Sequence, residues 1–368
     1  MKKIALILLF WLVVVNLFGL LALNRLNLVG DQAYNWIDPA KFFQEKTWNP
    51  VFLHAKWDSF WYLDIAQNGY SYKGVEKLSN IVFFPLYPFL IKVVSFFTLG
   101  NYILAGWLIS VIFLFLSLVY LYKITKEFHS EVDPYLPIFF LLIFPAAFFL
   151  NAVYTESLFL FLSLATFYYS LKKKFFWAGV FGLLSSLSRV TGVLLFLPVL
   201  WEYLKVYNFK IKEALNRKIL PLFLIPLGLF SFFIYHYLKF KNFFLFFWVE
   251  AWWGRFFNLN KEHFKFFSSS AITNFCLDAF FVAFILLIIF FVFKKLRASY
   301  GIYMLSTVAI ALSSGTLMSI NRYILVLFPI YIILAKIKNE YLKMSWIIIS
   351  ILLLALYIIL FVNNYWAG

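Results

Sequence analysis

The stretch IALILLFWLVVVNLFGLLAL, residues 4–23, decides the fold. It is twenty residues long and carries no charged side chain, and an α-helix of about twenty residues matches the hydrocarbon core of a bilayer. Lys2 and Lys3 precede it, as in a signal peptide, but the apolar run is long and no small-residue cleavage motif follows it. We therefore predict a retained first transmembrane helix.

The composition extends this prediction to the whole chain. Of the 368 residues, 64% are hydrophobic and only 13% are charged, and the mean hydropathy is +0.88. A water-soluble core of this size has too little interior to hide so much apolar surface. The aromatic share of 23% suits wide interfacial belts, and the single cysteine, Cys276, excludes an intrachain disulfide and a multi-cysteine metal site. We predict an all-α polytopic membrane protein.

Eleven apolar stretches approach spanning length, although several are short for a bilayer that needs roughly 20 residues. They are residues 4–23, 102–122, 135–150, 157–171, 175–187, 190–204, 219–238, 271–293, 298–314, 321–335 and 345–362. A further stretch, 81–99, contains Pro85, Pro88 and Lys92. If it spanned, nearly all the short basic loops would move to the outer side, against the positive-inside rule. We therefore predict about 11 transmembrane helices, a cytoplasmic N-terminus and an outer position for 81–99.

The predicted topology places two long segments outside, 24–101 and 239–270, in a single membrane domain covering 1–368. The first segment is rich in tryptophan, phenylalanine and tyrosine, which predicts helices that lie along the membrane face. No internal repeat or linker divides the chain. The net charge of +16 falls largely in short inner loops, so a nucleic-acid partner is not predicted.

Charged residues gather on the predicted outer side, where a charge at membrane depth is costly and needs a reason. The candidates are Asp58, Asp64, Glu156, Arg189, Arg255 and Arg322. A membrane-embedded site for an anionic, partly lipidic substrate requires carboxylates and guanidinium groups on one side. We predict that these distant stretches form such a site.

Asp58 lies in WDSFWYLDIAQNGY, residues 57–70, which predicts a short interfacial helix ended by its Asn-Gly pair. Asp58 is either the N-cap of this helix or a catalytic carboxylate. Asp64 follows six residues later and cannot share its helical face, so a paired-acid mechanism of the glycosidase type is not predicted.

His54 and Asp58 have an i, i+4 spacing that metal sites use. With four histidines in the chain and no HExxH motif, no metal site is predicted.

The other candidates also have plain structural interpretations. Glu156, in NAVYTES at 151–157, lies either in a solvated hairpin turn or at a helix start. Arg189 and Arg322 are either snorkelling side chains at the interface or buried cations with a partner. Arg255 stands among aromatic residues, a setting that more often indicates packing against a guanidinium than a ligand contact. The chain has no Walker A or GxGxxG loop, so a soluble nucleotide is not predicted as a substrate.

Taken together, these stretches resemble the PIG-V family of mannosyltransferases, within the GT-C class of polytopic glycosyltransferases. The resemblance rests on 57–70, FFPLYP at 83–88, 145–159 with its NAVYTES core, 188–192 and 322–329, in that order. One departure is Val-Thr-Gly after Arg189, where Ser-Asn-Gly is expected.

The resemblance implies a GT-C-like helical bundle in the cell membrane, or in the endoplasmic reticulum membrane of a eukaryote, with an extracytoplasmic active site. It implies a hexose donor, mannose, carried on a polyprenyl phosphate, and transfer with inversion at the anomeric carbon. No separate cofactor is expected. The acid of the first outer loop would be the base, which places that role on Asp58. The acceptor is a lipid or a glycan.

This chemistry agrees with the candidate residues. Inverting transfer requires one carboxylate that takes the proton of the acceptor hydroxyl. The leaving group is a phosphate, so a cation such as Arg189 or Arg322 helps more than a general acid does. Glu156 is predicted to bind a sugar hydroxyl or hold an arginine, and Asp64 and Arg255 are also predicted to contact substrate. A lipid-linked sugar transporter or flippase is the alternative, which Asp278 in a predicted span keeps open.

Overall fold

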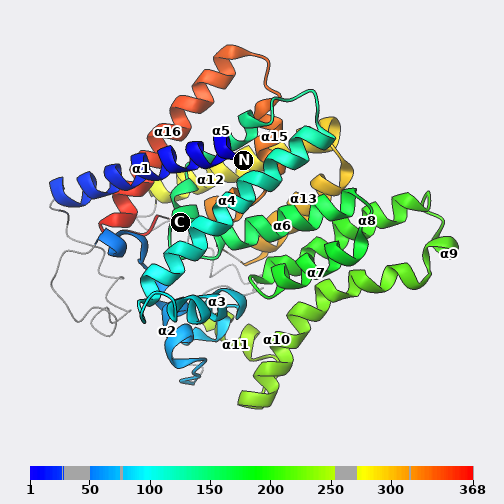
Figure 1. The fold of residues 1–368 in the computed structure, drawn as a ribbon, viewed down its shortest axis with the longest axis horizontal. Coiled ribbons are helices and arrows are strands. Elements are labelled where there is room, and N and C mark those ends of the chain that lie inside the picture. The colour runs from blue at the N-terminus through cyan, green and yellow to red at the C-terminus, as the bar shows by residue number, and fades with distance from the viewer. Residues whose placement is uncertain (27, 29–49, 75–77, 253–271, 315, 368) are drawn as a thin grey trace. The chain divides into compact units, whose positions relative to one another are not determined.

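The computed structural model describes residues 1–26, 28, 50–74, 78–252, 272–314 and 316–367. Every regular element in these ranges is an α-helix or a short 3₁₀ helix (Figure 1), so the all-α prediction is confirmed there. The chain divides into two compact units. Unit 1 comprises Met1–Gly69, Tyr87–Phe161 and Leu334–Gly368, and unit 2 comprises Tyr70–Leu86 and Leu162–Ile333. A single domain over 1–368 stays a prediction.

Unit 1 is built on the long helices α1 (Lys2–Arg25), α4 (Tyr102–Phe128) and α16 (Glu340–Val362). α1 packs against α16, and Figure 1 shows the two helices in blue and red. The shorter elements are η3 (Pro50–His54), α2 (Ser59–Asn68), most of α3 (Leu86–Ser95), α5 (Tyr135–Leu142), η5 (Ala147–Asn151) and the start of α6 (Glu156–Leu171).

Buried polar side chains join these helices at the NAVYTES stretch. Asn151 accepts a hydrogen bond from Trp107 Nε1 at 2.9 Å and donates one to Asn16 Oδ1 at 2.6 Å. Trp11 Nε1 donates to the carbonyl oxygen of Leu142 at 2.7 Å. Since an unmatched polar group in apolar surroundings is costly, these bonds fix how α1 and α4 face the stretch that leads into α6.

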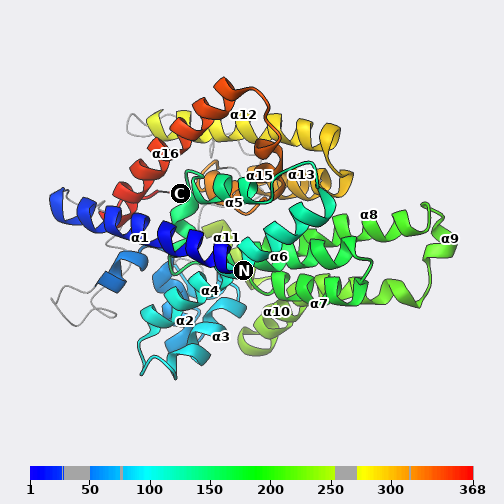
Figure 2. The ribbon, with the colours of Figure 1, turned by 45° about the horizontal axis from the view of Figure 1, so that its top comes forward.

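Unit 2 contains the remaining elements. They are η4 (Asn80–Val82), the rest of α6, α7 (Phe175–Ser186), η6 (Val190–Leu195), α8 (Phe196–Val206), α9 (Ile211–Ala214), η7 (Arg217–Phe223), α10 (Leu224–Phe240), α11 (Leu245–Trp252), α12 (Ile272–Lys295), α13 (Ala298–Ser313), α14 (Ile320–Leu325) and most of α15 (Pro329–Ala335). α7 and α10 lie side by side (Figure 2). Glycines allow this approach, because a Cβ on Gly228 would lie 2.6 Å from the carbonyl oxygen of Leu183.

Within the described residues, five helices are long and apolar enough to cross a membrane. They are Lys2–Arg25, Tyr102–Phe128, Arg217–Phe240, Phe275–Lys295 and Glu340–Val362, and each coincides with a predicted span. The chain is therefore a membrane protein. α3, α6, α7 and α13 are shorter apolar helices. The total of about 11 crossings and the loop topology stay predictions.

Two predicted spans are divided where prolines occur. The stretch 135–150 splits into α5 and η5 around Pro145, and 321–335 splits into α14 and α15, which begins at Pro329. Proline lacks an amide donor and clashes with the preceding turn, so a helix rarely continues through it. The stretch 190–204 is likewise divided, into η6 and α8.

Candidate active site

Asp58 follows a strained residue at the start of α2. Trp57 has a φ of 52°, in the left-handed region that bulky side chains rarely occupy. Its Nε1 donates to the carbonyl oxygen of Tyr365 at 3.1 Å, and its ring meets that of Trp366 edge-on at 5.3 Å. The C-terminal segment of unit 1 thereby stabilises the bend that presents Asp58.

The structure does not support the interpretation of Asp58 as a helix cap. Asp58 occupies the N-cap position of α2, but its side chain accepts no capping hydrogen bond. The residue is half-buried. α2 itself matches the prediction, because it ends at Asn68 and Gly69 follows with a φ of 78°. The side chain of Asp58 therefore does not stabilise the start of α2 in the way that the N-cap interpretation requires.

Tyr154 ties the NAVYTES stretch to the Asp58 segment. Its hydroxyl donates to the carbonyl oxygen of Lys56 at 3.0 Å and accepts from the backbone N–H of Asp58 at 3.3 Å. One residue earlier, the N–H of Val153 donates to the carbonyl oxygen of His54 at 2.9 Å. Two motifs almost a hundred residues apart in the chain are thus adjacent, as the predicted site requires.

Glu156 follows two residues after Tyr154 and is the first residue of α6. It is fully buried, at 0% exposed. The helix-start interpretation is therefore correct and the solvated hairpin turn is wrong. A carboxylate in the first turn of a helix is favoured by the helix dipole. Asp58 and Glu156 both belong to unit 1. Glu156 follows Tyr154 by two residues in the sequence, and the Tyr154 hydroxyl bonds to the backbone of Asp58.

Asp64 lies on α2 and has a local partner. The side-chain amide of Asn68 donates to its Oδ1 at 2.9 Å, one helical turn further on. Such an i, i+4 pair stabilises a helix surface. The structure thus gives Asp64 a local structural contact, and the absence of a paired-acid mechanism stays a prediction.

Lys56 is a residue that the sequence analysis did not single out. It is half-buried between Ala55 and Trp57, which are both buried, and burial lowers the pKa of its ammonium group to about 8. No carboxylate in the described residues forms an ion pair with it. A lone cation in the otherwise uncharged run 51–57 was the available signal.

His54 is buried and packs against an aromatic side chain. Its ring stacks on Trp107 at 5.1 Å, and burial lowers its pKa to about 3. Across the ranges that the structure describes, no three His, Cys, Asp or Glu side chains group closely enough to hold a metal ion.

Unit 2 brings the two arginine motifs together. The guanidinium carbon of Arg189 lies 5.4 Å from the ring centre of Tyr323, which directly follows Arg322. Arg322 is only 4% exposed, which argues against a snorkelling side chain. Arg255 lies outside the described residues. Whether these arginines share one cavity with Asp58 and Glu156 stays a prediction.

Comparison with known proteins identifies the family. The family model described as Mannosyltransferase (PIG-V) matches residues 4–250, which is more than half of the chain. The match includes Asp58, Glu156 and Arg189, whereas Arg322 lies beyond it. No curated protein and no solved structure matches the chain. The chain belongs to the PIG-V family of mannosyltransferases, and it is a membrane glycosyltransferase.

Proposed function

We propose that the protein transfers mannose from a polyprenyl-phosphate-linked donor to a lipid or glycan acceptor, with inversion, at the extracytoplasmic face of the membrane. The observation that carries this proposal is Asp58, a carboxylate without a capping role, on a bend that Tyr154 and Tyr365 both hold. Membership of a transferase family weighs against the transporter alternative.

Asp58 is proposed as the general base. As the acceptor oxygen attacks the anomeric carbon, Asp58 takes its proton, and the bond from that carbon to the phosphate oxygen breaks. The electron pair of that bond leaves with the polyprenyl phosphate. A single carboxylate suffices, and Asp64, which is paired with Asn68, is not needed for this step.

The departing phosphate is an anion and needs cationic stabilisation. Arg189 and Arg322 are proposed for this role because Tyr323 joins their motifs in unit 2. Lys56 is a third candidate and lies in the same unit as Asp58, two residues before it. Glu156 is buried and follows Tyr154 by two residues in the sequence. It is proposed to accept hydrogen bonds from sugar hydroxyls.

The test is transfer of labelled mannose from polyprenyl-phosphate mannose in proteoliposomes, with a membrane lipid and glycan extract as acceptor. Asp58→Asn keeps the size of the side chain and removes the base, so turnover should fall by roughly 10²- to 10⁴-fold. The control is Asp133→Asn, an exposed aspartate whose Oδ1 accepts from the N–H of Tyr135. Normal turnover by folded Asp58→Asn protein would contradict the assignment.

A further inference from the structure

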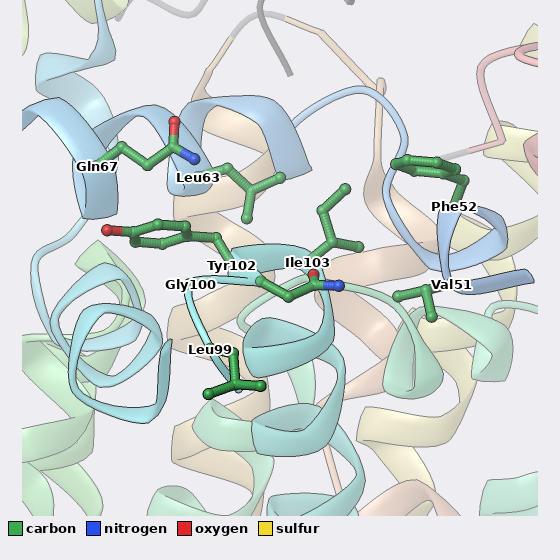
Figure 3. Close-up of a pocket in the computed structure, with 9 residues that line it drawn as sticks. Val51, Phe52, Leu63, Gln67, Leu99, Gly100, Tyr102 and Ile103 are labelled. Carbon is green, nitrogen blue, oxygen red and sulfur yellow. The ribbon is translucent and has the colours of Figure 1, made fainter. Parts of the chain in front are cut away.

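A cavity of about 340 Å³ lies in unit 1, beside α2 and the turn that leads into α4. Its volume falls in the range of small-molecule sites. Figure 3 shows the amide of Gln67 and the hydroxyl of Tyr102 toward one end, and Phe52 with Val51 toward the other. Leu63 and Ile103 lie between them in this view.

The polar groups of the cavity are available for a ligand. The side-chain amide of Gln67 and the hydroxyl of Tyr102 make no hydrogen bond with the part of the chain that the structure describes. Asn101 also lines the cavity, and its Oδ1 caps α4 by accepting from the N–H of Leu104 at 2.9 Å. The NH₂ group of Asn101 donates to none of the described residues. Together these groups supply donors and acceptors without a charge.

The lining selects the chemistry of the ligand. Among the described residues no charged side chain lines the cavity, so these residues offer no cation to a phosphate. The polar end of the cavity is unsuited to a prenyl chain, which would leave those groups without hydrogen bonds. A sugar ring fits both the polar and the apolar lining of the cavity. Its hydroxyls can form hydrogen bonds with the amide and phenol groups, and its C–H faces can pack on aromatic rings such as Phe52 and Tyr102.

The position of the cavity relative to Asp58 separates it from the transferred sugar. Asp58 directly precedes α2, and Gln67 lies nearly at the other end of that helix. The two residues are nine positions apart, which is about 13 Å along the helix axis. A sugar held at the Gln67 end of the cavity therefore does not have its anomeric carbon at Asp58.

We propose that this cavity binds a sugar unit of the acceptor, at a distance from the hydroxyl that Asp58 deprotonates. The acceptor is then a glycan or a glycolipid rather than a simple lipid alcohol. This inference rests on the proposed function for the role of the ligand, although binding of a neutral sugar to the cavity can be measured without turnover.

The binding experiment uses the full chain in lipid nanodiscs and mannobiose as the probe, followed by saturation-transfer NMR. Gln67→Leu and Tyr102→Phe should each raise the Kd for mannobiose by about three- to tenfold, since each removes one or two hydrogen bonds. The control is Tyr341→Phe on α16, which removes the same hydroxyl from a side chain that is 86% exposed. Inorganic phosphate should not compete with the sugar.

The kinetic experiment uses the labelled donor and oligosaccharide acceptors with the same variants. Gln67→Leu and Tyr102→Phe should raise the KM for the acceptor several-fold and keep kcat within about twofold. No binding of mannobiose, equal Kd values in all variants, or competition by phosphate would overturn the inference. If the sugar binds as expected but wild-type protein transfers no mannose, the proposed function fails and the sugar site stands.

Discussion

Replacing Tyr154 by phenylalanine tests whether the NAVYTES stretch holds the segment of the proposed base, Asp58, in place. Tyr154→Phe removes one oxygen and with it the hydrogen bonds to the carbonyl oxygen of Lys56 at 3.0 Å and from the N–H of Asp58 at 3.3 Å. Each bond contributes about 0.5–1.5 kcal/mol, and both backbone groups lose a partner, so we expect a loss of about 2 kcal/mol in unfolding free energy.

The larger effect is expected on turnover. The bond to Asp58 helps to hold a segment in which Trp57 has a left-handed backbone, a conformation that itself costs about 1–2 kcal/mol. Without the tether this segment can relax, and a displacement of Asp58 by about 1 Å would reduce turnover roughly 10²-fold.

The matched control is Tyr203→Phe in unit 2. Tyr203 is also fully buried, and its hydroxyl donates to the carbonyl oxygen of Ala214 at 2.8 Å and lies 3.3 Å from Asn216 Oδ1. Both variants should lose similar stability in fluorescence-monitored unfolding, but only Tyr154→Phe should lose turnover per folded molecule. Equal kcat values in the two variants would refute the positioning role.

Three further predictions concern stability. His54 has its pKa lowered to about 3, so the unfolded chain takes up a proton below pH 6.5 while the folded protein does not. Unfolding free energy should therefore fall by up to about 1.4 kcal/mol per pH unit between pH 6.5 and 3, and an equally steep fall in His54→Gln would assign the effect elsewhere. Burial lowers the pKa of Lys56 from 10.5 to about 8, so a charged Lys56 destabilises the folded protein below pH 8. Between pH 8 and 10.5 the folded protein releases this proton before the unfolded chain does, and the loss of stability disappears. Lys56→Met should be more stable than wild type at pH 7 but not at pH 10.5, and it should raise the KM for the donor. If the KM for the donor did not change, the proposed contact between Lys56 and the donor phosphate would be wrong. Gly179→Ala would place a Cβ against the carbonyl oxygen of Pro221 and should lower the unfolding free energy by about 1–3 kcal/mol. An unaltered melting curve would show that α7 moves away from Pro221 without loss of stability.

The sequence was sufficient for the helical class and for local features of the site. Composition predicted the membrane helices, the Asn-Gly pair predicted the end of α2, and the Thr-Glu-Ser run predicted a helix start at Glu156. These features depend on neighbours within a few residues. For that reason they can be derived from one chain without a structure.

Contacts between distant residues could not be predicted in the same way. The Tyr154 hydrogen bonds join residues 96 and 98 positions apart, and nothing local to either stretch indicates them. The burial of Lys56 and Arg322 also arises from packing, so snorkelling remained a reasonable expectation for Arg322. Pro145 and Pro329 each lie within an apolar stretch that was predicted as one span. The apolar content of these stretches gave no indication that the helix is interrupted there.

The contact between Trp57 and the carbonyl oxygen of Tyr365 has a practical consequence for handling this enzyme. It bridges 308 positions, so the segment around Tyr365 supports the bend that presents the proposed base, Asp58. A purification tag or fluorescent protein inserted close to Tyr365 and Trp366 would disturb these contacts, and the lost turnover would be mistaken for an intrinsically slow enzyme. Such a tag belongs away from these contacts, for example beside Met1, which is 68% exposed.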